Sequence, residues 1–403
     1  MTKDLIDPYN KLNILIKYGK GSYVYDQNDK KYLDFISGVA VLAFGHCHPK
    51  LVDTLNKQSL KLWHTSNILR TMENELLAKK IVNRSFANSV FFCNSGAEAV
   101  DTGIKMIRKY FKDKNEKNKY RFIVAEQGFH GRTIGAISAG GQEKLIKGFE
   151  PVLEGFDKVK FNDISAVENS ISENTAAIFI EPIQGEGGII PASKEYLINL
   201  RKLADEKNLL LFFDEVQTGI GRTGDFLSFE WAGIEPDVVA VGKGLGSGFP
   251  VGACLAKGNV SSALTVGSHG TTLGGNPLGM AIANKVLDEM DQKFLNNIKK
   301  VSSYFLEKLK DTVFKNKDSL NLVRGRGLML GLKCIVSNKV FQEVLASNGL
   351  LTVTAGDNVI RLLPPLTVNK KEIDEAINII NHSVNKMNKN VGFFKHNKEY
   401  EKV

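Results

Sequence analysis

Five short, continuously apolar runs alternate with amphipathic segments between about residues 75 and 285. The runs lie at residues 89–93, 121–125, 176–180, 209–213 and 237–241. Strands that are buried on both faces of a parallel sheet have this uninterrupted apolar character. Between the runs, apolar residues recur at helical spacing, at Val100, Ile104, Ile107 and Phe111 and again at Leu197, Leu200 and Leu203. The pattern predicts an α/β fold with a mostly parallel sheet flanked by helices.

The segments on either side of this region have a different pattern. In residues 1–44, aromatic and apolar residues surround the turn residues Asn28 and Asp29, which predicts a hairpin in a strand-rich arm. Beyond Pro277, apolar residues step by four and predict a pair of linking helices. Residues 320–385 mix strands, at 328–334 and 359–363, with helices, and the polar tail 388–403 is expected to be frayed. We therefore predict three parts: an N-terminal arm (1–44) that joins the small domain, a large domain (45–285), and a C-terminal small α+β domain (286–403).

Composition narrows the class of protein. Hydrophobic residues make up 43% of the 403, which is enough for a large core, so disorder of the whole chain is excluded. No run approaches the roughly 20 apolar residues of a membrane span, and we expect no secretory signal. The four cysteines form no C-x-x-C pair, so we expect no disulfide framework, no metal site and a cytoplasmic location.

The chain carries a formal net charge of +9. Because its lysines are scattered among Asn, Asp and Glu, we interpret them as a solvated surface. Attraction of anionic small molecules is the alternative. No nucleic-acid-binding motif is present, so no nucleic-acid partner is expected.

Two polar features follow predicted strands directly. The segment Asn94-Ser95-Gly96-Ala97-Glu98 lies between the first apolar run and an amphipathic helix. Ser95 and Glu98 form an S-x-x-E capping box, and such a helix N-terminus offers free N–H groups to a phosphate, although the segment also fits an ordinary helix cap. Asp214 directly follows the run 209–213, at the strand end where open α/β sheets bind ligands.

Nucleotide-binding patterns are absent or misplaced. No segment fits the phosphate-binding pattern G-x-x-x-x-G-K-[ST]. Residues 219–224 fit G-x-G-x-x-G, but five residues separate them from the preceding strand, and no long helix is predicted after them. A dinucleotide site at this position is therefore disfavoured.

Lys243 follows the run 237–241 and lies between two glycines, which leave room for an aldehyde to reach its amine. Residues 269–277 form a loop rich in glycine and threonine, whose hydroxyl and N–H groups suit a phosphate. Each feature alone also fits an ordinary turn. Together with the turn at Gly96 and with Asp214, they match the needs of pyridoxal 5'-phosphate: an anion site, a carboxylate for the ring nitrogen and a lysine for the aldehyde.

In its motifs and their order, the chain resembles the class III (subgroup III, fold-type I) pyridoxal-phosphate aminotransferases, and among them most closely the acetylornithine branch. The resemblance covers residues 18–377 and rests on GHCHP (45–49), LWHTSN (62–67), NSGAEA (94–99), GFHGRT (128–133), EPIQGEGG (181–188), DEVQTGIGRTG (214–224), GKGLG (242–246), GTTLGGNP (270–277) and RLLPPL (361–366). It implies the fold-type I transferase fold, in which a large domain with a mostly parallel sheet is joined to a smaller α+β domain.

The resemblance also implies which residues hold the cofactor. Lys243 would bind it covalently and Asp214 would hold its ring N–H, so these two would be catalytic. Phe129 would stack on the ring, and Gln217 would contact the side of its O3′. The full expected cofactor set is Gly96, Ala97, Phe129, Asp214, Glu215, Val216, Gln217, Lys243 and Thr272.

Within that set, backbone N–H groups of Gly96 and Ala97 would bind the phosphate. Thr272 would reach the phosphate of a second subunit, since family active sites are shared across a homodimer. For the substrate, the resemblance places a carboxylate on Arg132, and Thr271 nearby. The α-carboxylate of glutamate would pair with Arg361, whose switchable partner would be Glu186.

The expected reaction is transamination of N2-acetylornithine with 2-oxoglutarate, which gives N-acetylglutamate 5-semialdehyde and glutamate, in arginine biosynthesis. Family members that favour free ornithine have a tyrosine before the GHCHP motif, and residues 37–44 contain none. Alternatives within the family are transamination of ornithine, succinylornithine, succinyldiaminopimelate, 4-aminobutyrate or an N-acyl lysine. An aminomutase or decarboxylase, a catalytically silent binding protein and a NAD-dependent dehydrogenase are further alternatives.

Overall fold

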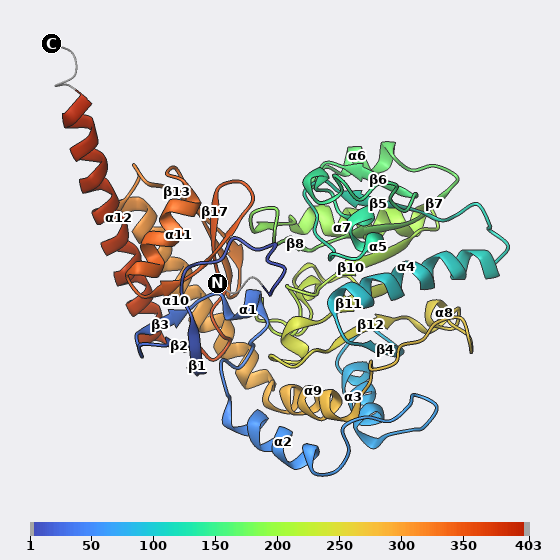
Figure 1. The fold of residues 1–403 in the computed structure, drawn as a ribbon. Helices are drawn as coiled ribbons and strands as arrows, with labels where there is room; N and C mark the ends of the chain where they lie inside the picture. The colour runs from blue at the N-terminus through green and yellow to red at the C-terminus, as the bar shows by residue number, and fades with distance from the viewer. Residues whose placement is uncertain (1–3, 399–403) are drawn as a thin grey trace.

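The computed structural model of the protein describes residues 4–398 and contains a seven-stranded sheet in the order β4-β12-β11-β10-β7-β5-β6 (Figure 1). All pairings between its strands are parallel except the two that involve β12. The strands are β4 (Ser89–Cys93), β5 (Arg121–Ala125), β6 (Phe156–Val159), β7 (Thr175–Ile180), β10 (Leu210–Asp214), β11 (Val238–Val241) and β12 (Gly252–Ala256). The mixed α/β class and all five strands expected from the sequence are confirmed.

Two strands of this sheet were not expected. Strand β6 lies at the sheet edge, pairs only with β5, and has the charged residues Asp157 and Lys158 in its middle. Strand β12 has the sequence GACLA, in which small residues dilute the apolar signal, yet it is buried throughout and inserts antiparallel between β11 and β4. Burial in the sheet, rather than side-chain hydrophobicity, therefore stabilises β12.

Helices cover both faces of this sheet. Along β10, Leu210 and Phe212 belong to the apolar cluster that includes α4 (Gly96–Asp113), whereas Leu211 and Phe213 belong to the cluster that includes α7 (Lys194–Glu206). Alternate residues of a strand point to opposite faces, so both faces of β10 are buried. This two-sided burial is the physical reason for the uninterrupted apolar runs.

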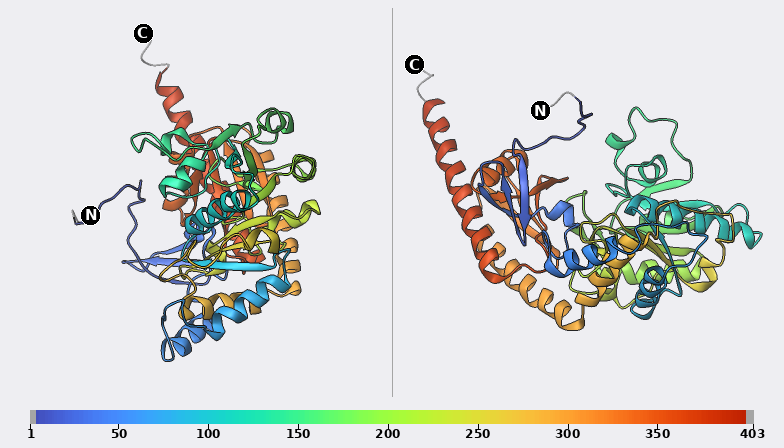
Figure 2. Two further views of the ribbon diagram at one scale, coloured as in Figure 1. Left: turned by 90° about the vertical axis from the view of Figure 1, so that its right-hand side faces the viewer. Right: turned by 60° about the horizontal axis from the view of Figure 1, so that its bottom comes forward.

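The N-terminal and C-terminal segments form two further four-stranded sheets beside α10 (Gln292–Lys315), α11 (Asn338–Ser347) and α12 (Lys370–Lys398) (Figures 1 and 2). The first has the order β1-β2-β3-β15 and contains the expected hairpin, with β2 antiparallel to β3. The second is antiparallel, in the order β13-β14-β17-β16. The strands are β1 (Ile16–Lys20), β2 (Tyr23–Asp26), β3 (Lys31–Asp34), β13 (Leu320–Arg326), β14 (Met329–Cys334), β15 (Leu350–Leu351), β16 (Val353–Ala355) and β17 (Val359–Leu362).

Strand β15 pairs with β3, so the N-terminal arm is hydrogen-bonded to the C-terminal part of the chain. The division into residues 1–44, 45–285 and 286–403 stays a prediction. The linking helices are α9 (Pro277–Glu289) and α10 (Gln292–Lys315), separated at Asp291, whose carboxylate caps α10 by accepting from Phe294 N at 2.7 Å. The prediction of a frayed tail is wrong as far as residue 398, because α12 (Lys370–Lys398) continues to that point. Residues 399–403 of the predicted tail lie outside the described range.

The shorter elements connect these layers. They are α1 (Ser37–Ala40), α2 (Pro49–Ser59), α3 (Met72–Asn83), α5 (Ile134–Ala139), η1 (Glu143–Leu145), α6 (Ile164–Asn169), β8 (Ile183–Gln184), β9 (Ile190–Pro191), η2 (Ser228–Ala232), η3 (Lys243–Leu245), α8 (Gly258–Ser261) and α11 (Asn338–Ser347). Within residues 4–398, no helix combines the length and the apolar character that crossing a membrane requires.

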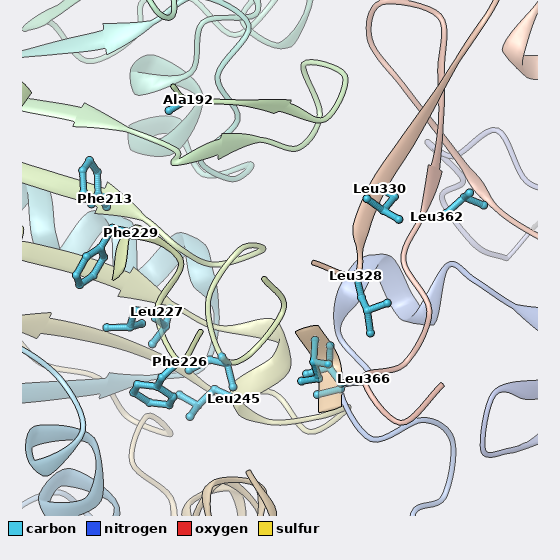
Figure 3. Close-up of a cluster of buried hydrophobic side chains, with 14 of the residues drawn as sticks. Ala192, Phe213, Phe226, Leu227, Phe229, Leu245, Leu328, Leu330, Leu362 and Leu366 are labelled. Carbon is cyan, nitrogen blue, oxygen red and sulfur yellow. The ribbon is translucent and has the colours of Figure 1, made fainter. Parts of the chain in front are cut away.

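One apolar cluster joins the seven-stranded sheet to the C-terminal sheet (Figure 3). From the first side it contains Phe213, Phe226 and Leu245, and from the second it contains Leu330 and Leu362. The contact fixes the ends of β10 and β11 relative to β17. Because Asp214 ends β10 and Arg361 lies on β17, this packing brings candidate residues from distant parts of the chain to one place.

Candidate active site

Asp214, the last residue of β10, is only 5% exposed and has two hydrogen-bond donors. Its Oδ2 lies 2.8 Å from Nδ1 of His130, and its Oδ1 accepts from Val216 N at 3.0 Å. The His130 ring packs against the Phe179 ring, with the centroids 4.1 Å apart. A carboxylate is thus held rigidly at the carboxyl end of a parallel strand, where the sequence predicted it.

The N-terminus of α4 lies beside this strand end. Ser95 caps the helix, because its Oγ accepts from Glu98 N at 3.2 Å. The other half of the expected capping box differs: Glu98 Oε2 accepts from Asn94 N at 2.7 Å. A Cβ on residue 96 would overlap Cγ1 of Val216, so only glycine allows the helix terminus to approach the loop after β10 so closely.

Lys243 follows β11 and begins the 3-10 helix η3, with a positive φ of 39°. Burial, and to a smaller extent the positive charge of Arg361, lower the pKa of its amine to about 8. The carboxylates of Glu186, Asp214 and Glu181 oppose this shift. The lysine therefore has a substantial neutral, nucleophilic fraction near neutral pH, which an ordinary surface lysine lacks.

These groups line one cavity of about 180 Å³ that is partly open to solvent. Concave sites with a few convergent polar groups are typical places for small molecules to bind. The lining residues are Gly96, Ala97, Phe129, His130, Gly131, Glu181, Glu186, Asp214, Val216, Gln217, Thr218 and Lys243. The structure thus brings together most of the residues that the sequence predicted.

Three buried polar atoms of this lining have no hydrogen-bond partner within the described residues: Oε1 of Gln217, Oγ1 of Thr218 and Nε2 of His130. Burying a polar atom without a partner costs about 1–3 kcal/mol. Their clustering around one cavity therefore fits a polar ligand that supplies the missing partners. Pyridoxal phosphate fits this set, because its ring nitrogen, O3′ and phosphate need the acceptors and donors found here.

A buried ion pair lies at the cavity edge. Arg361 on β17 is 2% exposed; its Nη1 lies 2.6 Å from Oε1 of Glu186, and its Nη2 donates to the Thr354 carbonyl at 3.1 Å. Glu186 is the less buried partner, with 31% of its side chain exposed. An arginine that is fixed, and paired with a carboxylate that has access to solvent, is suited to exchange that carboxylate for one from a ligand.

Other expected residues lie outside the lining. The Glu215 carboxylate points away from the cavity and accepts from Ser228 N, Ser228 Oγ and Phe229 N at 2.6–2.8 Å. Burial raises the pKa of Glu215 to about 7, and these hydrogen bonds oppose the rise. Its side chain caps η2, so any contact with a ligand in the cavity would have to come from its backbone.

The two threonines and Arg132 are also outside. Thr271 Oγ1 accepts from Gly274 N at 3.1 Å and lies 3.4 Å from Nδ2 of Asn94, next to α4. Thr272 is exposed on the surface of the same loop. Arg132 is exposed, with its guanidinium carbon 5.7 Å from the ring centroid of Phe129.

Sequence reasoning missed His130 and Glu181 as site residues. Glu181 follows the end of β7 and accepts from Phe129 N and Gly185 N, both at 3.0 Å. Burial raises its pKa to about 7, which the charge of His130 opposes and that of Asp214 reinforces. The strand-end rule that singled out Asp214 applies equally to Glu181, so that signal was present.

The G-x-G-x-x-G segment has a structural place. Arg222 is fully buried, and its Nη1 donates to the carbonyls of Leu328 at 3.2 Å and Pro364 at 2.6 Å. The next element along the chain is the short 3-10 helix η2, not the long helix of a dinucleotide site. The segment joins two sheets and presents no helix N-terminus to a pyrophosphate.

Comparison with known proteins adds three findings. The family model for class III aminotransferases matches residues 7–384. The acetylornithine aminotransferase of Brucella melitensis is 44% identical over 384 residues, which cover 95% of each chain. Two solved structures are similar: N-acetylornithine aminotransferase from Stenotrophomonas maltophilia K279a (TM-score 0.82, 32% identity, 94% of this chain and 97% of that one) and ornithine aminotransferase from Toxoplasma gondii with partial occupancy of PLP at the active site (TM-score 0.89, 31% identity, 93% and 91%).

Proposed function

Because the chain belongs to the class III aminotransferases, we propose that it transfers the terminal amino group of N2-acetylornithine to 2-oxoglutarate, with pyridoxal 5'-phosphate as cofactor. The products are N-acetylglutamate 5-semialdehyde and glutamate, a step of arginine biosynthesis in the cytoplasm. The observation that carries the proposal is the single cavity that joins Lys243, Asp214 and the α4 terminus, with the Glu186–Arg361 pair at its edge.

Different lining residues would hold different parts of the cofactor. Backbone N–H groups of Gly96 and Ala97, at the positive end of α4, bind the phosphate. Asp214 would hold the ring N–H and keep it protonated, Phe129 would stack on the ring, and the side-chain amide of Gln217 would contact the O3′ side. When bound, the cofactor supplies an electron sink for the substrate carbanion.

Lys243 has two tasks. Its amine would hold the cofactor covalently, and its lowered pKa makes the neutral, nucleophilic form of the amine available. The same Nζ would take a proton from the substrate carbon and return it during the reaction. A Lys243→Ala protein is expected to fold but lose turnover; near-normal turnover would overturn the assignment.

Arg361, Glu186 and Arg132 would let one site take two donors in turn. Glutamate has two carboxylates, so it can use both arginines. N-acetylornithine reacts at its terminal amine and brings one distant carboxylate, which Arg132 would hold at the rim. Glu186 then stays on Arg361 and neutralises it, at the 2.6 Å separation seen between them.

We further propose a homodimer in which Thr272 completes the partner's phosphate site and Thr271 lies near the substrate. The support is geometric: Thr272 is exposed and does not line the cavity of its own chain. Two-fold symmetry would give each loop a site on the other subunit.

Free ornithine is the second candidate donor, because the Toxoplasma ornithine aminotransferase has the higher TM-score of the two structures. Purified holoenzyme should show a higher kcat/KM for N-acetylornithine than for ornithine, with 2-oxoglutarate as acceptor. A preference for ornithine would overturn the substrate choice and leave the reaction class. A colourless protein that binds no pyridoxal phosphate would indicate a silent relative, and tight binding of NAD would favour a dehydrogenase.

A further inference from the structure

The loop that carries Thr271 and Thr272 begins at a histidine with two partners on α4. His269 Nδ1 lies 2.7 Å from Nζ of Lys105, and its Nε2 lies 2.9 Å from Oγ1 of Thr102. Its ring also packs on Phe91 of β4, with the centroids 4.7 Å apart. This imidazole therefore ties the start of the loop to the helix that offers the phosphate site.

The hydrogen bonds assign the state of the imidazole. An ammonium group has only donors, so Nδ1 of His269 must accept from Lys105. Nε2 then carries the hydrogen and donates to Thr102 Oγ1, whose own hydrogen goes to the Glu98 carbonyl at 2.7 Å. The chain of donors is consistent only with a neutral His269.

The rest of the loop is held by groups that do not titrate. Asn67 Nδ2 donates to the carbonyls of Thr271 and Gly274, both at 3.0 Å. Asn74 Nδ2 donates to the Gly275 carbonyl at 3.2 Å. Side-chain amides keep these bonds at any moderate pH, so His269 is the contact of this set whose strength depends on acidity.

We propose that His269 is a positioning residue that fixes the Thr271–Thr272 loop only while its imidazole is neutral, and that cofactor phosphate binding in the neighbouring subunit is acid-sensitive for this reason. The inference rests on the proposed function, since it takes Thr272 to complete the partner's site. It adds a residue that touches neither cofactor nor substrate.

The physical cause is the second N–H that protonation adds. An imidazolium would point its Nδ1 hydrogen at the Lys105 ammonium, which cannot accept it, and would set two positive charges 2.7 Å apart. Burial lowers the pKa of His269, Lys105 lowers it further, and the Glu98 carboxylate opposes both. Lys105 and Glu98 of α4 are the charged groups that face the ring, and Phe91 of β4 is uncharged.

The sign follows from linkage. The anchored loop depresses the pKa of His269, so anchoring is complete above the ordinary histidine pKa of about 6.5 and is lost as pH falls. If phosphate binding requires the anchored loop, the dissociation constant rises by up to about tenfold at pH 5.5. Lys105 is exposed and can partly move away from a protonated His269, which reduces the effect. We therefore expect the dissociation constant of the cofactor to rise by about three- to tenfold through this contact.

The test measures the dissociation constant of pyridoxal phosphate at pH 8.0 and 5.5 by equilibrium dialysis. Every protein carries Lys243→Ala, which removes the titration of that amine and the covalent bond. Lys105→Gln is the matched variant, because an amide can donate to neutral Nδ1 and accept from a protonated one. His269→Gln removes the titrating group, and titration of the ligand phosphate is common to all proteins.

The parent should lose about three- to tenfold more affinity at pH 5.5 than either Lys105→Gln or His269→Gln. In cofactor-free protein, hydrogen exchange of backbone amides 270–276 is compared with that of Lys105→Gln at each pH. The parent should be less protected than Lys105→Gln at pH 5.5 but not at pH 8.0. If all three proteins lose the same factor of affinity between pH 8.0 and pH 5.5, this inference is overturned and the proposed function stands. Failure of every protein to bind the cofactor at pH 8.0 would overturn both.

Discussion

Replacing Glu186 by glutamine is expected to separate the two half-reactions. The substitution keeps the size of the side chain and a possible hydrogen bond to Arg361 but removes the negative charge. Arg361 is 2% exposed, so it then holds an unpaired positive charge whenever the bound donor brings no carboxylate to it. N-acetylornithine is such a donor, whereas glutamate supplies the missing carboxylate itself.

The size of the effect follows from burial. Breaking a fully buried ion pair by removing one partner costs about 3–5 kcal/mol. Because 31% of the Glu186 side chain is exposed, solvent screens part of this cost, and about 1–3 kcal/mol is a reasonable range. That corresponds to a loss of about 5- to 150-fold in kcat/KM for the N-acetylornithine half-reaction. The glutamate half-reaction should be unchanged or improved, since glutamate no longer displaces a carboxylate.

Single-turnover absorbance changes, recorded with each donor separately, measure the two rates. Glu195→Gln removes an exposed carboxylate on α7 and is the matched control, expected to leave both rates as they are. An equal loss in both half-reactions of Glu186→Gln would refute the switch, because it would mean that Glu186 supports the site in a way that does not depend on the donor.

Three other predictions concern the cofactor site. Asp214→Asn should lower the half-reaction rates by several powers of ten, because an amide cannot keep the ring nitrogen protonated; an unchanged nitrogen pKa in a spectroscopic titration would contradict this role. Attachment of cofactor to apoprotein should speed up as pH rises through about 8, the pKa of Lys243, and Arg361→Met should shift this profile to higher pH, because it removes a charge that lowers that pKa. Light scattering should find a dimer, and a fully active monomer would exclude the shared site. Mixing inactive Lys243→Ala chains with Thr272→Asp chains should restore activity, because in the mixed dimer the Thr272→Asp subunit keeps its own lysine and receives a normal threonine from its partner.

The seven-stranded sheet was largely predictable because both of its faces are buried. Uninterrupted apolar runs found five strands, and the strand-end rule then found Asp214 without any view of the fold. Strand β12 was not predicted because Gly252, Ala253 and Ala256 carry little hydrophobic signal, and its burial comes from neighbours far away in the sequence. Edge strand β6 was not predicted because the charged residues Asp157 and Lys158 interrupt its apolar pattern.

The site was predictable where chemistry and position coincide. Asp214 ends a strand and Lys243 follows one, and each has a side chain suited to one part of the cofactor. Neighbourhood in the sequence does not fix the direction of the side chain at Glu215, whose carboxylate points away from the cavity and onto the N-terminus of η2. Alternation along an extended chain reverses the direction of successive side chains, so adjacent residues of a motif need not share a site.

Contacts between distant segments lay beyond sequence patterns. The pairing of His130 with Asp214 joins the segment after β5 to the end of β10, and the pairing of Arg361 with Glu186 joins β17 to the segment after β8. Periodicity describes one element at a time, and the resemblance to a family was needed to suggest the second pair. Neither source pointed to His269, whose role depends on a tautomer that only three-dimensional contacts define.

The charges around Lys243 form a balance that both half-reactions would preserve. Arg361 lowers the pKa of the amine, whereas Glu186, Asp214 and Glu181 raise it. When glutamate binds, its carboxylate would replace Glu186 on Arg361, so one negative charge is exchanged for another near the same guanidinium. The lysine would then keep a similar pKa with either donor, as a group that takes and returns a proton in both directions must. Glu186→Gln breaks this balance only with N-acetylornithine, because no carboxylate then faces Arg361; the pKa of Lys243 in the cofactor-free variant should accordingly fall below about 8, and added glutarate, a dicarboxylate that cannot react, should raise it again.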